Sequence, residues 1–476
     1  MKLLFVGAEA LPFASTGGLA DVLGSLPAAL KREEGDTLDI RVVLPLYQSI
    51  GEKYRDQMEK VSEYFVQLSW RNQYCGLYEY VQNGVTYYFI DNQYYFSRGN
   101  LYGNFDDGER FAFFCMAVME MMPKIGFFPD VLHAHDWQSA LTVIYLRTKY
   151  NWLKEYRQIR TVYTIHNIDY QGIYNMDILG DVFGLSDYER SIVEYNGMIN
   201  LTKGAIVCCD RLTTVSQRYA EEIQMDYFAS GLQHILRMYS GKVMGIVNGI
   251  DTDYYNPETD PSIFMNYTTQ TVGEGKAANK AELQKQFSLP ESPATPIIAM
   301  VSRLASHKGF DLVKYAIERL LTHDVQFVLL GTGENDLESF FESLQKRYPE
   351  KVSVLLAYNK EISKQIYAGA DIFLMPSKSE PCGLAQMIAS RYGTVPIVRE
   401  VGGLYDTIHP FNPTTGEGNG ITFCTYDAMD MLDACIRAIN LYADPAAWNV
   451  LRANAMEMDF SWAVSAKKYL ELYLSL

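Results

Sequence analysis

The chain has 476 residues, of which 48% are hydrophobic and 21% charged, so it can pack ordinary globular cores and is long enough for two of them. Its formal net charge of −16 argues against nucleic acid as a partner, because binding a phosphate backbone requires a basic face. No apolar run approaches the length of a membrane span, so we expect no membrane partner either.

The cysteines and the first residues of the chain indicate the cellular compartment of the protein. The start, MKLLFVGAEALPF, lacks the basic, apolar and small-residue layout of a signal peptide. The seven cysteines form no CxxC pair, and their odd number favours reduced thiols. We therefore expect a cytoplasmic protein without disulfides.

Short β-prone apolar runs alternate with helical patterns, which predicts an α/β fold with parallel sheets. The strands expected in the first half are 3–6, 40–44, 131–133, 161–165, 211–215 and 243–247. Apolar residues at helical spacing predict a helix over 109–122, and Asn83 with Gly84 predicts a two-residue hairpin turn. The helix that follows Gly18 is expected to kink or end at Pro27.

Residues 256–296 interrupt this alternation with Pro, Thr, Ser and Gly, so we interpret them as the connection between two domains. The alternation then resumes with expected strands at 297–301, 326–330, 352–356, 372–375 and 395–398 and expected helices at 309–321 and 334–347. The two halves predict two Rossmann-like, doubly wound domains that face each other across a cleft. Ligands of such sheets bind beyond the carboxyl ends of the strands, so site residues should directly follow strands.

A glycine pair, Gly17 and Gly18, separates the first expected strand from the first expected helix. Because glycine has no side chain, backbone amide groups at this junction can approach an anion at the positive end of the helix. The alternative interpretation is a tight turn without a ligand. The G-x-G-x-x-G fingerprint is absent, which argues against a nicotinamide dehydrogenase.

Two further segments end expected strands with polar side chains. A metal site at His133 and His135 is disfavoured, because we expect an extended pair to point to opposite faces and no third ligand lies nearby in the sequence. Asp136 is interpreted as a helix N-cap or as an acceptor for a sugar hydroxyl. His166 follows the next strand, where a structural histidine and a site residue are both plausible.

The second half offers cations and a carboxylate at the same kind of position. Arg303 and Lys308 lie between a strand and a helix and would form a clamp for a diphosphate, although a solvated surface pair is the alternative. Glu380 precedes Gly383, which opens a helix, so this segment presents a sugar-hydroxyl acceptor and a second group of backbone amides. Residues 402–403 are another glycine pair before a helix, so each half offers Gly-Gly-Leu to one charged donor.

Taken in order, these segments resemble the bacterial glycogen synthases and plant starch synthases, retaining glucosyltransferases with the two-Rossmann GT-B fold. The matching segments are TGGLADV, YGNFDDGERFAFF, HAHDWQ, TIHNIDYQG, TTVSQRYAEEI, GIVNGIDTDYYNP, VSRLASHKGFD, MPSKSEPCGL, YGTVPIV and GGLYDTI. The resemblance covers the whole chain. It implies an N-terminal domain at 1–245 that is completed by a C-terminal helix at 457–476, and a nucleotide-sugar domain at 246–456. We expect hinges near 246–256 and 455–460.

The resemblance also implies an activity: transfer of glucose from ADP-glucose to the non-reducing end of an α-1,4-glucan, glycogen or a maltooligosaccharide, with retention and without metal or cofactor. The implied catalytic residues are His166, Arg303, Lys308 and Glu380. The implied donor-binding residues are Ser15, Gly17, Gly18, Asp136, Asn248, Tyr358, Cys382, Gly383 and Leu384. In this scheme the cations and amides bind the diphosphate, the polar side chains hold glucose, and the tyrosine stacks on adenine.

The family pattern is not fully kept on the donor side. The family's first motif has a lysine that reaches the donor phosphate, and Ser15 stands at that position here. Lys378 replaces the usual arginine before the glutamate, and Ala385 replaces a threonine. These changes predict a reduced activity, and they leave open an alternative, a catalytically weakened paralogue that binds glucan or regulates an active synthase.

Overall fold

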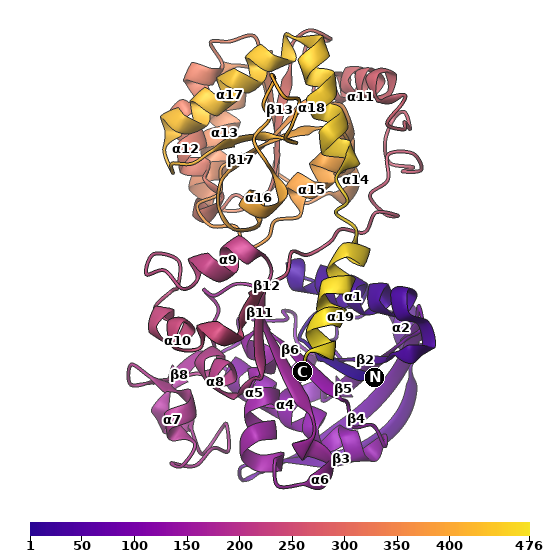
Figure 1. The fold of residues 1–476 in the computed structure, drawn as a ribbon, viewed down its shortest axis with the longest axis vertical. Helices are drawn as coiled ribbons and strands as arrows, with labels where there is room; N and C mark the ends of the chain where they lie inside the picture. Colours follow the sequence, from indigo (N-terminus) through magenta and orange to yellow (C-terminus); the bar gives the residue numbers. More distant parts are fainter. The chain divides into compact units, whose positions relative to one another are not determined.

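The computed structural model describes all 476 residues, and the chain forms two compact units (Figure 1). Unit 1 comprises Met1–Gly249 and Trp462–Leu476, and unit 2 comprises Ile250–Ser461. The chain therefore passes from unit 1 to unit 2 after Gly249 and returns after Ser461. None of its helices combines the length and the apolar character needed to cross a bilayer.

Unit 1 is built on a nine-stranded sheet in the order β12-β11-β7-β6-β1-β2-β5-β4-β3. These strands are β1 (Lys2–Val6), β2 (Asp39–Pro45), β3 (Glu59–Leu68), β4 (Arg71–Gln82), β5 (Val85–Asp91), β6 (Val131–His135), β7 (Arg160–Ile165), β11 (Arg211–Thr214) and β12 (Val243–Gly245). The strands from β12 to β5 pair in parallel, while β3 and β4 add an antiparallel edge. The central strands are buried along nearly their whole length, as expected of a parallel sheet covered on both faces.

The predicted hairpin is confirmed between β4 and β5. Asn83 and Gly84 have φ angles of 53° and 75°, the left-handed pair that a two-residue turn between right-twisted strands requires. A separate small antiparallel sheet in unit 1 joins β8 (Ile173–Asn175), β10 (Met198–Asn200) and β9 (Glu194–Tyr195).

Helices cover the sheet of unit 1. They are α1 (Gly18–Glu34), α2 (Glu52–Arg55), α3 (Gln93–Phe96), α4 (Asp107–Lys124), α5 (Trp137–Tyr145), α6 (Lys154–Arg157), α7 (Arg190–Val193), α8 (Leu201–Cys208), α9 (Gln217–Glu222), α10 (Gln233–Met238) and α19 (Trp462–Leu474). The helix predicted over 109–122 is α4. Of the two alternatives predicted for Pro27, a kink or the end of the helix, the second is wrong, because α1 continues through this residue to Glu34, with Pro27 itself buried.

The C-terminal helix α19 is part of unit 1. Its buried residues recur at helical spacing and include Trp462, Ala466, Tyr469 and Tyr473, so one face of the helix is apolar. Figure 1 shows α19, in yellow, beside the indigo helix α1, with which it is in contact. The Ser465 hydroxyl donates to the backbone oxygen of residue 247 at 2.6 Å, which attaches the start of α19 to the end of the first segment.

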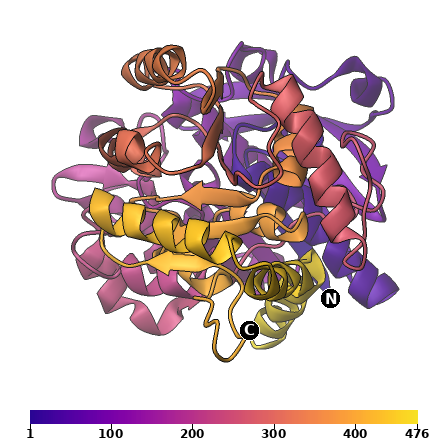
Figure 2. The ribbon, with the colours of Figure 1, turned by 90° about the horizontal axis from the view of Figure 1, so that it is seen from above.

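Unit 2 is built on a six-stranded parallel sheet in the order β15-β14-β13-β16-β17-β18. The strands are β13 (Ile297–Val301), β14 (Gln326–Leu330), β15 (Val352–Leu355), β16 (Ile372–Met375), β17 (Val395–Arg399) and β18 (Ile421–Phe423). Its helices are α11 (Val272–Gln286), α12 (Phe310–Leu320), α13 (Asn335–Arg347), α14 (Lys360–Gly369), α15 (Ala385–Arg391), α16 (Gly402–Thr407), α17 (Ala428–Tyr442) and α18 (Pro445–Glu457). Figure 2 shows helices on both sides of the strands of this unit.

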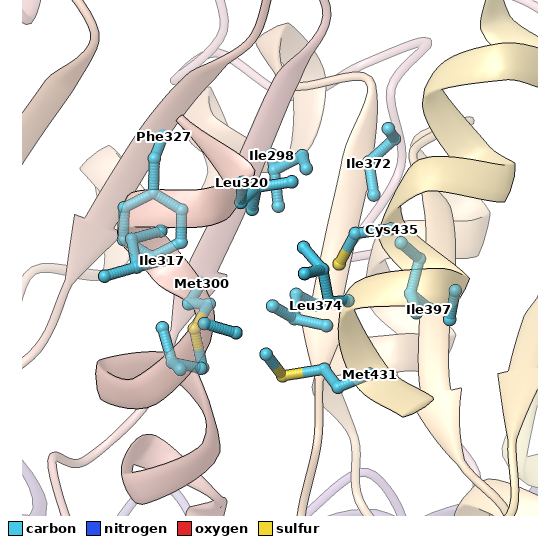
Figure 3. Close-up of a cluster of buried hydrophobic side chains, with 14 of the residues drawn as sticks. Ile298, Met300, Ile317, Leu320, Phe327, Ile372, Leu374, Ile397, Met431 and Cys435 are labelled. Atoms are coloured by element: carbon cyan, nitrogen blue, oxygen red, sulfur yellow. The ribbon is translucent and has the colours of Figure 1, made fainter. Parts of the chain in front are cut away.

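The core of unit 2 lies between the sheet and the helices α12, α13 and α17. Strand residues such as Ile298, Leu374 and Ile397 point toward Ile317 of α12 and Met431 of α17 (Figure 3), and all of them are almost completely buried. Close packing of this kind accounts for the strong apolar signal of these strands in the sequence. Strands β13 and β16 pair in parallel, with Ile298 opposite Ile372, so their carboxyl ends lie side by side.

The interpretation of residues 256–296 as an inter-domain connection is wrong, because the whole segment belongs to unit 2. Helix α11 packs against α14, and two of its lysines are buried. The Lys276 ammonium donates to the carbonyl of Tyr367 at 3.1 Å, and Lys280 pairs with Asp371 at 2.8 Å. The polar composition of the segment is compatible with a short helix, but it did not indicate that this helix docks and that its charges are satisfied internally.

Candidate active site

The candidate residues of unit 1 follow neighbouring strands at the carboxyl edge of its sheet. Asp136 directly follows β6, His166 follows β7 and Asn248 comes shortly after β12. The glycine pair at 17–18 follows β1 and begins α1. Parallel pairing brings the ends of β7, β6 and β1 to one edge, which is where ligands of doubly wound sheets bind.

Asp136 has a strained backbone. Its φ of 57° and ψ of 176° lie in a region that residues other than glycine rarely adopt, at a cost of about 1–3 kcal/mol. Two hydrogen bonds hold the residue there: its amide donates to the Thr164 carbonyl at 2.9 Å, and its Oδ1 accepts from the His166 amide at 2.8 Å. The carboxylate is thus locked onto the first residue after β7.

The pKa values in this region are shifted by loss of solvent. Burial, followed by the charge of Glu9, raises the pKa of Asp136 to about 7, while the amides of His166 and Asn167 oppose the rise. Burial lowers the pKa of His166 to about 3, so its imidazole is neutral at physiological pH. A carboxyl group that titrates near neutrality beside a neutral imidazole is typical of a functional site.

The raised pKa of Asp136 makes a prediction about stability. The stability that this carboxyl contributes is complete below its ordinary pKa of 3.8 and is lost as the pH rises through about 7, because the folded chain holds the proton more tightly than the unfolded chain. Between about pH 5.5 and about pH 8, we expect the free energy of unfolding of unit 1 to fall by roughly 2 kcal/mol relative to an Asp136→Asn variant. Urea titrations followed by hydrogen exchange in unit 1 peptides measure this difference. Equal pH slopes in both proteins would contradict it.

The expectation that His133 and His135 point to opposite faces is wrong. Alternate residues of a strand share a face, and the two ring centres lie only 4.1 Å apart, both buried. The Nδ1 atom of His135 lies 3.0 Å from Nε2 of His166 on the adjacent strand. Nowhere in the chain do three or more His, Cys, Asp or Glu side chains gather in a way that could hold a metal ion.

Glu9, which sequence reasoning missed, organises the loop before α1. Its carboxylate accepts from the hydroxyl of Thr16 at 2.6 Å, from the amide of Gly17 at 3.3 Å and from the phenol of Tyr102 at 2.6 Å. The Gly17 amide is therefore already bonded to a carboxylate. The amides of Gly18 and the next residue make no hydrogen bond within the chain, so they are the ones that can meet an anion.

In unit 2, Lys308 and Glu380 meet at the ends of two adjacent strands, β13 and β16. The ammonium donates to both carboxylate oxygens, at 2.9 and 2.7 Å, and Ser377 donates to the carboxylate at 2.9 Å. The Glu380 side chain is 7% exposed and the Lys308 side chain 20%. Nearly buried carboxylates are stable only when paired in this way. Sequence reasoning identified the two charges but not the supporting serine.

The loop that carries Glu380 is shaped by its neighbours. Gly383 has a φ of 75°, and the Gln386 amide donates to the backbone oxygens of Cys382 and Gly383 at 3.1 Å each. Cys382 is buried, and Leu384 is the N-cap of α15. Gln386 was missed by sequence reasoning, although its place in the first turn of the helix was a usable signal.

The second glycine pair has a different role from the expected one. A Cβ atom at Gly402 would lie 2.0 Å from the Glu380 carbonyl oxygen, and one at Gly403 would lie 2.2 Å from that of Cys382. The Gly403 amide donates to the Glu380 carbonyl at 3.1 Å. These glycines permit the close approach of the loop at 380–383, so the idea of matching anion-binding glycine pairs in the two halves is not supported.

Two of the three remaining candidates are exposed, and the third is buried with a polar atom that has no partner. Arg303 is exposed and makes no ion pair or hydrogen bond through its guanidinium within the chain. Tyr358 is 84% exposed in the loop after β15. Asn248 is buried, yet its Oδ1 atom has no hydrogen-bond partner. Unused hydrogen-bonding capacity at strand ends is what a binding site for a polar ligand provides.

Solved structures share this architecture. The catalytic domain of starch synthase IV from Arabidopsis thaliana, bound to ADP and acarbose, has a TM-score of 0.90 and 34% sequence identity, covering 99% of this chain and 98% of that chain. A sucrose-phosphate synthase from Thermosynechococcus elongatus has a TM-score of 0.62 at 18% identity, covering 100% and 98% of the two chains, and shows the fold alone. Two doubly wound α/β units with polar residues at the ends of their strands define a glycosyltransferase with the GT-B fold.

Sequence comparisons specify the family. The family model described as starch synthase catalytic domain matches residues 2–238, and that described as glycosyl transferases group 1 matches residues 281–451. A glycogen synthase of Bacillus cereus (strain B4264) is 48% identical over 478 residues, with 100% of both chains covered. One from Ligilactobacillus salivarius (strain UCC118) is 46% identical over 475 residues, with 99% of both covered. The chain belongs to the glycogen and starch synthase family of glucosyltransferases, which confirms the resemblance and gives no support to the alternative of a weakened paralogue.

Proposed function

We propose that this glucosyltransferase uses ADP-glucose as donor and extends the non-reducing end of an α-1,4-glucan with retention of configuration. The observation that carries the proposal is the pair of Lys308 and Glu380, together with the unpaired guanidinium of Arg303, which also follows β13. The 34% identical starch synthase IV, which was solved with ADP and acarbose, supports the choice of ligands. The seven cysteines are all free thiols, which suits the reducing cytoplasm.

In the proposed reaction, the bond between the anomeric carbon and the ADP oxygen breaks, and its electron pair leaves with the diphosphate. The acceptor 4-hydroxyl bonds to the same face of the anomeric carbon and gives its proton to a phosphate oxygen. An ammonium has three donors, and Lys308 uses two on Glu380, so one remains for the departing phosphate. The planar guanidinium of Arg303 can donate two parallel hydrogen bonds to phosphate oxygens. Both cations stabilise charge that develops as ADP leaves.

The other proposed site residues bind the donor without taking part in bond changes. Asp136, His166, Asn248 and Glu380 would hold the glucose hydroxyls, and the His166 carbonyl would lie near the positive charge that develops at the anomeric carbon. Asn248 has a buried oxygen without a partner, as a hydroxyl-binding amide would have in the unliganded chain. Tyr358 would stack on adenine, for which its exposure leaves the ring faces accessible. Gly18, Gly383 and Leu384 would contribute backbone amides to the diphosphate.

The function is tested by incubating the chain with glycogen and radiolabelled ADP-glucose or UDP-glucose. We expect label in the polymer from ADP-glucose at the higher rate. β-Amylase should then release the label as maltose, because this enzyme cuts α-1,4 chains from their non-reducing ends. Label that resists β-amylase would overturn the proposed linkage, and preferred use of UDP-glucose would overturn the proposed donor.

We propose that Ser15 lowers the affinity for the donor phosphate, because a neutral hydroxyl stands where the resemblance to the family implies a lysine. Ser15 is exposed, so Ser15→Lys can add a cation without disturbing the core. An added charge of this kind contributes about 1 kcal/mol, so we expect kcat/KM for ADP-glucose to rise about fivefold. Ser15→Met adds length without charge and is the matched control. An unchanged rate in the lysine variant would show that the missing charge has no effect.

A further inference from the structure

Three buried or half-buried histidines and a tyrosine of the C-terminal helix form one cluster in unit 1. The Tyr473 hydroxyl lies 2.7 Å from Nδ1 of His133, whose Nε2 lies 2.6 Å from the Thr164 hydroxyl. The ring of His133 packs against that of His135, with ring centres 4.1 Å apart. The mechanism proposed above uses only the far end of this cluster, His166, which His135 contacts.

The ring of His135 has little freedom to move. Phe5 of β1 stacks on it with ring centres 6.0 Å apart, and His133 packs close to it as well. Both ring nitrogens of His133 are engaged, one by α19 through Tyr473 and the other by β7 through Thr164. The rigid packing of neighbouring groups is what allows one side chain to orient another.

The two nitrogens of His135 have unequal surroundings. Nδ1 lies 3.0 Å from Nε2 of His166, whereas Nε2 is buried and has no hydrogen-bond partner. Burial and the neighbouring histidines keep the pKa of His135 well below its usual range, so the ring is neutral and carries a single N–H. A buried N–H without an acceptor is less tolerable than a buried lone pair without a donor. The proton of His135 therefore belongs on Nδ1.

We propose that His135 is a positioning residue for His166: its Nδ1–H donates to Nε2 of His166 and so leaves the single proton of His166 on Nδ1. No hydrogen bond within the chain uses Nδ1 of His166, so this N–H is the donor that can meet a ligand. Only the role of His166 toward the donor sugar rests on the proposed function. The tautomer is a property of the unliganded chain.

The tautomer is tested directly by nitrogen NMR of the full chain labelled in its histidines. The chain has seven histidines, and a His166→Gln variant assigns the signals of this one. We expect a protonated, pyrrole-type Nδ1 and an unprotonated, pyridine-type Nε2 for His166 near neutral pH. His234 is exposed in the same unit and serves as the internal reference for an unconstrained ring. A protonated Nε2 on His166 would overturn the proposal.

Two substitutions at the same position separate positioning from packing. His135→Asn keeps an N–H donor near the place of Nδ1, whereas His135→Leu fills similar space without a donor. We expect kcat for glucosyl transfer to fall about tenfold in the leucine variant, as is usual when the orienting partner of a functional imidazole is lost. The asparagine variant should stay within about threefold of the natural chain. A folded leucine variant as active as the asparagine variant would overturn the positioning role.

The NMR and kinetic experiments still test the proposal if one of them fails. If the leucine variant does not fold, the NMR measurement on the natural chain still decides the tautomer. If the chain transfers no glucose from ADP-glucose, the proposed donor is wrong, while the His166 tautomer still supports or overturns the present inference. If His166 carries its proton on Nε2 in His135→Leu but on Nδ1 in His135→Asn, the hydrogen bond from residue 135 determines the tautomer.

Discussion

Lys308→Met is expected to lower kcat for glucosyl transfer by about 10²–10³-fold, because in the proposed reaction it removes a preorganised cation from the departing diphosphate. It should also destabilise unit 2 by about 1–3 kcal/mol, since Glu380 then stays nearly buried without its partner. Steady-state kinetics with ADP-glucose and thermal unfolding measure the two effects.

The double variant Lys308→Met with Glu380→Gln separates the two effects. Removing the carboxylate charge relieves the desolvation penalty, so the double variant should recover to within about 1 kcal/mol of the natural stability. Its kcat should remain as low as that of the single variant or lower. If activity returned together with stability, the lysine would be a structural partner of the glutamate and not a group that acts on the donor.

Arg303→Ala is expected to lower kcat/KM for ADP-glucose by about 10²-fold or more, since it removes the guanidinium that we propose binds the donor phosphate through two hydrogen bonds. Stability should change by less than about 0.5 kcal/mol, because the side chain is exposed and unpaired in the chain. Arg303→Lys keeps the charge but cannot donate two parallel hydrogen bonds, so its kcat/KM should lie between that of the alanine variant and that of the natural chain. The measurement is initial-rate kinetics over a range of donor concentrations.

Arg347→Ala is the matched control for the loss of a cation from unit 2. Arg347 is also partly exposed, but it lies on α13 and pairs with Glu318 of α12. Its removal changes the net charge by the same amount and should leave kcat/KM for ADP-glucose unchanged. Equal losses in both arginine variants would mean that the effect comes from the general charge of the protein and not from the end of β13.

The strands of unit 2 could be predicted closely from the sequence. The expected strands 297–301, 326–330 and 372–375 agree in both bounds with β13, β14 and β16. A parallel strand that is buried on both faces must be almost continuously apolar. A run of apolar residues in the sequence therefore indicates such a strand directly. The same constraint explains why residues that directly follow strands could be selected as candidates, since the chain becomes polar where the sheet ends.

The docking of α11 could not be predicted in the same way. This helix has a polar sequence, and its charges are satisfied by groups far along the chain, such as the pair of Lys280 with Asp371. Hydrophobic periodicity carries no information about such pairs, because each partner looks solvated in its own segment. Composition therefore suggested a linker where the structure has a packed element.

The supporting residues of the candidate site show the same limit. Glu9 follows β1 just as other candidates follow their strands, yet one of its partners, Tyr102, is 93 residues away. No sequence pattern singles out Ser377 or Gln386, and only their hydrogen bonds in the folded chain show their supporting roles. Local signals locate charges and glycines, whereas the groups that orient them come from distant segments.

The order of residue types along the chain was sufficient for the α/β class, the family and the strand ends that carry polar side chains, because these features depend on short-range periodicity and local motifs. Folding was needed to unite Lys308 with Glu380, to bond His135 to His166 and to bring Tyr473 of α19 against His133. These contacts join segments between 31 and 340 residues apart. Their geometry follows from the register of parallel strands and from the packing of α19, which no local pattern encodes.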